Sequence, residues 1–135
     1  MTKSHFSILS HVYHRIMALE VARQITGGVY KSVRPAGSDK EDIVIYAQDF
    51  ISRAGETARV KIDIYSSPIF SSRADAVDMV PDFKRLEYLS GLIFDGIDEV
   101  FYAGCLSWVD SQRFSREDDM FCCHMEICVS LRGAF

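Results

Sequence analysis

The sequence lacks any run of about 18 apolar residues, so we expect no membrane-spanning helix. The N-terminal stretch MTKSHFSILSHVYH has neither an unbroken apolar core nor a small-residue cleavage site, so no signal peptide is expected. Cysteine is also scarce, with four residues of which three share one short stretch. Such spacing does not suit a disulfide framework. Together these absences predict a protein of a reducing cytoplasm that keeps its thiols free.

A basic surface is missing as well. Acidic residues outnumber basic ones by 19 to 15, and the net charge is -4. A protein that coats DNA needs a positive patch for the phosphates, so this composition excludes that class. It does not exclude a protein that surrounds DNA without gripping it. The length of 135 residues, with 48% hydrophobic and 25% charged residues, predicts one globular domain over residues 1–135.

Catalytic motifs are absent too. The stretch ITGGVYK has glycines but lacks the GK[ST] ending of a phosphate-binding loop and does not follow an expected strand. There is no G-x-S-x-G elbow, and the acidic stretch REDD lacks the fixed ligand offsets of a calcium-binding loop. We therefore predict that the protein is not an enzyme and uses no cofactor.

One stretch, FCCHMEIC at residues 121–128, does carry possible metal ligands. Alternation along a strand puts Cys122, His124, Glu126 and Cys128 on one face. Cys122 and Cys128 would then lie roughly 20 Å apart, so the four side chains cannot bind one ion. Only the neighbouring Cys122 and His124 could contribute, with further ligands from elsewhere. We favour a strand with a polar outer face, and keep a metal or redox site that uses Cys122, His124 and Cys128 as the alternative.

Periodicity and turn residues predict the order of elements. Residues 5–25 show a helical apolar stripe that drifts near Glu20, and a second helix follows Pro81. Expected strands cover residues 29–31, 42–47, 59–67, 99–109 and 120–131, with a long loop over 68–80 and a charged hairpin tip over 110–119.

This order predicts an α+β fold, an antiparallel sheet of four to five strands with two helices packed on one face. The clearest strand alternates Val60, Ile62 and Ile64 with polar residues. Its polar side, with Asp63, would join His124 on a solvated sheet face.

The chain as a whole resembles the tail terminator, or tail completion, proteins of long-tailed phages and prophages. The most specific part is GGVYKSVRPAGSDKEDIVI, which is similar to prophage-encoded members from gut bacteria. The resemblance continues through RVKIDIYSS, a long loop, PDFKRLEYLSGLIF and two closing strands joined by a charged tip. It covers nearly all of the chain and is one of pattern and element order.

The resemblance implies a homo-oligomeric ring, typically a hexamer, that caps the finished tail tube. Such a ring stops tube polymerisation, presents a surface to the head–tail connector and lets DNA pass through its lumen without sequence-specific binding. It implies no catalytic residue, no cofactor and no membrane. The protein would reside in the host bacterial cytoplasm during assembly and then in the virion tail. A head–tail connector or another small phage or secretion adaptor is the alternative.

The family supplies no invariant site, so interface residues are predicted from loop chemistry. Three long segments are polar and carry both charge signs, as expected for loops that order against a partner. The predicted interface residues are Arg34, Pro35, Gly37 and Asp39 in the first segment, Arg73 and Asp75 in the second, and Arg113, Arg116 and Asp118 in the third.

Overall fold

The computed structural model describes residues 5–50, 57–73, 76–117 and 119–130. The elements are α1 (His5–Ala18), α2 (Val21–Gln24), β1 (Val29–Lys31), β2 (Ile43–Phe50), β3 (Thr57–Ser66), β4 (Ile69–Arg73), β5 (Ala76–Val80), α3 (Phe83–Ile97), β6 (Val100–Tyr102), β7 (Cys105–Glu117) and β8 (Met120–Ser130). None of the helices in these ranges is long and apolar enough to cross a membrane.

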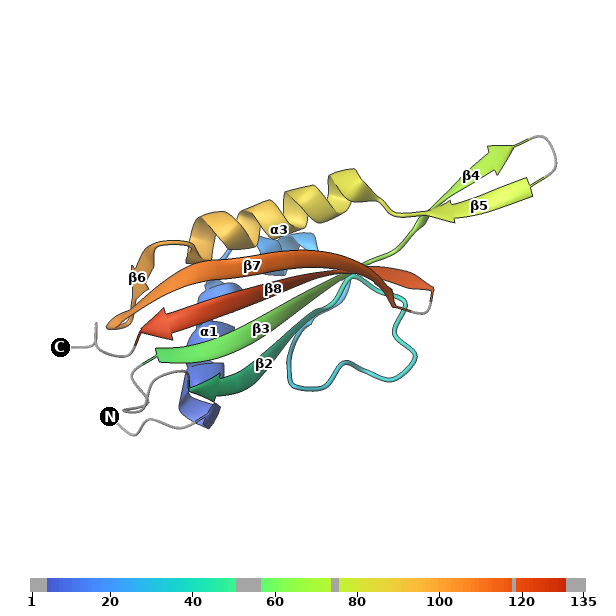
Figure 1. The fold of residues 1–135 in the computed structure, drawn as a ribbon. Helices are drawn as coiled ribbons and strands as arrows, with labels where there is room; N and C mark the ends of the chain where they lie inside the picture. The colour runs from blue at the N-terminus through green and yellow to red at the C-terminus, as the bar shows by residue number, and fades with distance from the viewer. Residues whose placement is uncertain (1–4, 51–56, 74–75, 118, 131–135) are drawn as a thin grey trace.

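The main sheet has six strands in the order β1-β2-β3-β8-β7-β6 and curls into a half-barrel (Figure 1). It is mixed, because β1 runs parallel to β2 while every other neighbouring pair is antiparallel. The prediction of an antiparallel sheet of four to five strands with two helices is therefore wrong. The described residues form a six-stranded mixed sheet, a separate two-stranded sheet and three helices.

Two local causes explain this error. The strand VYK is three residues long, too short for side-chain alternation to indicate its direction, and an eleven-residue connection over 32–42 returns the chain parallel to it. The expected strand 99–109 is divided by a turn, so β6 and β7 form a short hairpin with Ala103 and Gly104 at positive φ.

All three helices pack against one face of the sheet. α1 and α2 supply Ile16 and Val21, α3 supplies Ile93, and the sheet supplies Ile62 and Met125. The helix expected after Pro81 forms, and its first turn is capped by Asp82, whose carboxylate accepts a hydrogen bond from the backbone N–H of Arg85 at 3.1 Å. This face is the apolar core and carries most of the hydrophobic stabilisation.

The segment 68–80 is a β-hairpin rather than the long loop that we expected. β4 and β5 pair with each other from Ile69 opposite Val80 to Arg73 opposite Ala76, and the hairpin extends beyond the sheet and α3 (Figure 1). We call β4 and β5 the arm. A two-stranded ribbon that packs on no other sheet or helix need not show a period-2 apolar pattern, and residues 68–80 show none in the sequence.

The charged stretch 110–119 was predicted as a hairpin tip, and this is wrong for most of it. β7 continues to Glu117 and pairs with β8 from Leu106 opposite Ser130 to Glu117 opposite Met120, with a register shift between Val109 and Ser111. Most side chains in the second half of β7 are exposed, which explains why this part of the strand is polar and charged.

Candidate partner-binding site

A cleft of about 790 Å³ lies at one end of the sheet, where β3 ends and β8 begins. Three segments line it: the connection between β1 and β2, the base of the arm, and the turn between β7 and β8. These are the three segments that the sequence nominated as partner-binding. We call this hollow the end cleft.

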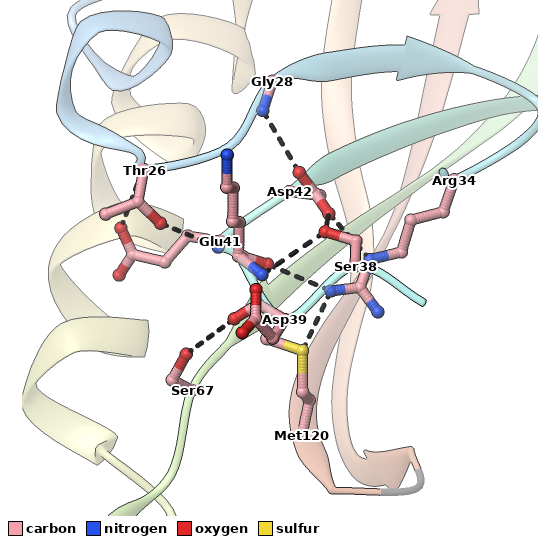
Figure 2. Close-up of polar contacts among 10 residues, drawn as sticks. Thr26, Gly28, Arg34, Ser38, Asp39, Glu41, Asp42, Ser67 and Met120 are labelled. Carbon is pink, nitrogen blue, oxygen red and sulfur yellow. Dashed lines mark hydrogen bonds and ion pairs between the residues drawn. The ribbon is translucent and has the colours of Figure 1, made fainter. Parts of the chain in front are cut away.

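The wall of the end cleft formed by residues 34–42 is held in place by a buried carboxylate. Asp42 is 1% exposed and accepts three hydrogen bonds, from the backbone N–H of Gly28 at 3.1 Å, from Arg34 Nε at 2.9 Å and from Ser38 Oγ at 2.5 Å (Figure 2). A buried charge of this kind is stable only when its lone pairs are satisfied. The network therefore fixes the path of the connection rather than leaving it free.

Arg34 joins this wall to the two strands behind it. Its Nη2 lies 3.0 Å from the carbonyl oxygen of Lys40 and 2.9 Å from Met120 Sδ, and its guanidinium carbon lies 4.0 Å from the centroid of the Tyr65 ring. Arg34 is thus a structural link. Asp42 neutralises its charge, and its guanidinium makes a cation–π contact with the Tyr65 ring. Burial raises the pKa of Tyr65, so this ring stays a neutral phenol at neutral pH.

A second buried acid fixes the same connection to the helices. Arg85 of α3 holds Glu41 with Nε at 2.6 Å and Nη2 at 2.8 Å, and it donates a further hydrogen bond to the carbonyl oxygen of Gln24 at 2.5 Å. The hydrogen bonds with Glu41 raise the pKa of Arg85 above its usual value. Thr26 completes the anchor by accepting from the backbone N–H of Glu41 at 3.0 Å. Two adjacent acids therefore tie the wall to both layers of the molecule.

Gly27 is required where this anchor passes α2. A Cβ there would overlap the carboxylate of Asp42 and the backbone carbonyl of Glu41. α2 ends at Gln24, with Ile25 as its C-cap, and Gly27 follows it, where it permits a close approach of the chain to the buried acids.

The opening of the end cleft combines acidic and apolar groups. Asp39, Glu117 and Asp119 supply carboxylates, while Phe70 and Met79 supply apolar surface from the arm. Phe70 is 69% exposed and contributes apolar surface that a partner could cover. This lining suits a protein segment with apolar and basic side chains. The described residues that line the cleft include no histidine or cysteine.

The structure places the predicted interface residues unequally. Arg34, Pro35, Gly37 and Asp39 all line the end cleft. Of the second segment, Arg73 is the last residue of β4 and only its backbone is described, whereas Asp75 lies outside the described residues.

The third segment divides between two surfaces. Arg116 is exposed near the end of β7, and Asp118 lies outside the described residues. Arg113 lines a different hollow, of about 440 Å³, between β7 and α3, together with Phe83 and Phe114. Phe83, the first residue of α3, is exposed.

Residues that the sequence did not single out make up the rest of the end cleft. Ser38, Tyr65, Ser67, Glu117 and Met120 all line it. Ser67 donates a hydrogen bond to the carbonyl oxygen of Asp39 at 3.1 Å and so links the base of the arm to the wall. In the sequence, the signal for this site was the pair of acids Glu41 and Asp42 directly before the apolar strand β2. Charged residues are unexpected at such a position unless they are paired.

Cys122 and His124 do not lie on a solvated face. Both are buried, as is Asp63 opposite His124 in the register of β3 and β8. The prediction that Asp63 and His124 point into water is therefore wrong. Long side chains of the same face lie beside these small polar ones: Lys61 Nζ lies 3.4 Å from Asp63 Oδ2 and 5.6 Å from the centroid of the Tyr46 ring. Cys128 is also buried. It lies two residues beyond Glu126 and therefore four residues beyond His124 on the same strand.

Neither the family models nor the curated proteins compared with this chain match it.

Proposed function

We propose that this chain is a subunit of a non-enzymatic ring that ends the tail of a long-tailed phage, capping the tail tube and joining it to the head–tail connector. The observation that carries the proposal is the arm, which extends away from the body of its own subunit (Figure 1). Two-stranded ribbons are marginal alone in water, and this one exposes Ile69 and Phe70 near its base. A neighbouring subunit would cover it.

The edge of the sheet offers a matching surface. Among the residues that the structure describes, β6 pairs with Cys105, Leu106 and Ser107, and the rest of β7 has β8 as its one neighbour within the sheet. An open strand edge of this length is a template for pairing with another chain. The arm of one subunit and the open edge of β7 in the next subunit would make a head-to-tail contact. Such contacts close into a ring when the rotation between subunits allows it.

The remaining features agree with this role. The end cleft combines acidic and apolar groups and would suit a protein partner, such as the tube protein or the connector. The net charge of -4 would let DNA pass through a lumen without being held. The sequence resemblance supplies the expectation of a hexamer. A head–tail connector built from the same kind of ring is the alternative, and tube binding discriminates between them.

The decisive experiment measures mass in solution by light scattering and ring formation by negative-stain microscopy, with and without purified tail tubes. We expect rings of one stoichiometry, bound at tube ends. Phe70→Ser should abolish them, while Phe101→Ser, which changes a phenylalanine of similar exposure (62%) on β6, should not. Monomers that ignore tube ends, or equal behaviour of the two variants, would refute the proposal.

Charge reversal tests the tip of β7 in the same assay. Arg116→Glu should weaken ring formation or tube capping and leave the fold intact, because the residue is exposed at the end of a strand. The same change at Arg73 should act likewise. Unchanged oligomer mass together with unchanged tail length would count against a role for these positions.

A further inference from the structure

A thiol, an imidazole and a carboxylate meet on the buried polar face of the sheet. Asp63 of β3 lies directly opposite His124 of β8, and Cys122 is two residues before His124 on the same face. His124 Nδ1 lies 2.6 Å from Asp63 Oδ1 and 3.8 Å from Cys122 Sγ, and the three ligand atoms all lie within 4.8 Å of one another. The exposed fractions of Cys122 and His124 are 0% and 3%. Asp63 of β3 therefore supplies, from another strand, the further ligand that the sequence around Cys122 and His124 does not contain.

We propose that Asp63, Cys122 and His124 bind one zinc ion, with water in the fourth position. Zinc prefers the thiolate, imidazole and carboxylate ligands found here, and three protein ligands leave one coordination position open. Ligand atoms around tetrahedral zinc lie about 3.4 Å apart. The sulfur is already close to that separation from Nδ1, and the carboxylate oxygen reaches it by giving up its hydrogen bond to the ring.

The hydrogen bonds on the far side of the ring support this assignment. His124 Nε2 lies 2.7 Å from Ser115 Oγ, and Ser115 Oγ donates to Glu117 Oε1 at 3.0 Å. With its own proton given to Glu117, Ser115 accepts from Nε2–H. The lone pair of the neutral ring then sits on Nδ1, which faces a carboxylate at 2.6 Å. Two such acceptors need a cation between them, either a proton or a metal ion.

The same network supplies the support that a metal-binding histidine needs. A ligating imidazole generally donates its other N–H to a hydroxyl, carbonyl or carboxylate, which fixes the ring. Ser115 and Glu117 fill that role. The contact order Ser115–His124–Asp63 also resembles that of a hydrolase triad. However, Ser115 directs its proton to Glu117 and not to His124, so the network orients the ring rather than activating a nucleophile.

Charge also balances at the site. One thiolate and one carboxylate neutralise the divalent ion, and the positive charge of Lys61, whose Nζ lies 3.4 Å from Asp63 Oδ2, is offset by Glu117, whose Oε1 lies 3.4 Å from His124 Nε2. Burial, followed by the charge of Asp63, raises the pKa of the Cys122 thiol. The bare site therefore holds a neutral thiol, and zinc must displace its proton on binding. Since the ligands are buried, the ion enters during folding or through local opening.

The test compares two cysteines of one strand face. The chain is unfolded and refolded with Zn²⁺ or Co²⁺, desalted and measured for bound metal, and the cobalt form is inspected for a sulfur-to-cobalt charge-transfer band in the near ultraviolet. Wild type and the matched control Cys128→Ser should retain about one ion per chain. Cys122→Ser should lose the band, and His124→Gln should lower zinc affinity at least about tenfold.

Three outcomes would overturn the proposal: no retained metal in the wild type, cobalt bound without the band, or a band of equal strength in Cys122→Ser and Cys128→Ser. The wild-type spectrum tests whether any thiolate binds the ion, even where a variant does not refold, and the comparison of the two serine variants assigns that thiolate to Cys122. The result is independent of the ring, because monomers and rings contain the same three ligands.

Discussion

Two buried aspartates sit in this molecule with different partners. Asp42, before β2, accepts hydrogen bonds from Gly28, Arg34 and Ser38. Asp63, within β3, contacts the histidine ring of His124 at 2.6 Å and the ammonium of Lys61 at 3.4 Å. The first carboxylate is satisfied by a permanent cation, a hydroxyl and a backbone N–H. The second carboxylate, that of Asp63, has its shortest contact with the His124 imidazole, a ring that can release its proton.

This difference separates a structural anchor from an exchangeable site. A guanidinium stays charged at every relevant pH, so the Asp42 network has one arrangement and makes the wall of the end cleft rigid. An imidazole can release its proton and bind a metal through the same nitrogen. We therefore expect substitutions at Asp42 to affect folding and substitutions at Asp63 to affect metal binding.

The largest effect is expected from Asp42→Asn. The amide cannot serve Arg34, Ser38 and Gly28 together, and the guanidinium loses its counter-ion. Breaking a buried pair in this way costs about 3 kcal/mol of unfolding free energy. Urea titration followed by circular dichroism measures this loss. Asp39→Asn on the exposed rim is the control and should change stability by less than about 0.5 kcal/mol; equal losses in the two variants would show that Asp42 is no anchor.

Gly27→Ala should come next and act on the same anchor from the backbone. The added methyl group would overlap the Asp42 carboxylate and the Glu41 carbonyl, so the chain must shift. Overpacking of this kind costs about 2.5 kcal/mol. Thermal unfolding compares it with Gly91→Ala, because a Cβ at Gly91 of α3 meets nothing within 4 Å. That control should be neutral or slightly stabilising in a helix, and a matching loss in it would contradict the steric explanation.

The sequence predicted the apolar face of the sheet but not the burial of its polar face. Alternation in β3 correctly separated Ile62 and Ile64 from Lys61 and Asp63, because period 2 follows from strand geometry alone. Whether the polar side meets water depends on how far the sheet curls and on which long side chains cover it. Those are tertiary properties, and no local pattern around Asp63 reports them.

The candidate sites show the same division. Polar loop chemistry marked the three segments that line the end cleft, yet nothing in the sequence indicated that they meet at one end of the sheet. Cys122 and His124 were visible as a pair, but their third partner lies 61 residues from His124 and depends on the pairing of β3 with β8. Register between distant strands is set by the whole fold, so the cluster could be found only in three dimensions.

Asp63→Asn sharpens the contrast between the two aspartates. Loss of the charged hydrogen bond to His124 should cost about 2 kcal/mol in metal-free protein, less than the loss at Asp42. More tellingly, the added stability from zinc should disappear in Asp63→Asn and persist in Asp42→Asn, because only the first removes a ligand. Melting curves with zinc and with a chelator measure both quantities. A full zinc response in Asp63→Asn would remove Asp63 from the ligand set.

The smallest effect should come from Arg34→Lys, which keeps the charge beside Asp42 and removes the planar fork. An ammonium can still pair with the carboxylate, but it cannot also reach the Lys40 carbonyl and Met120 while lying flat on Tyr65. We expect a loss of about 1 kcal/mol, measured by urea titration. The zinc response should stay intact, since Arg34 belongs to the anchor and not to the metal ligands. A weakened zinc response in this variant would mean that the two buried acids are coupled through Tyr65, and the separation between anchor and exchangeable site would then fail.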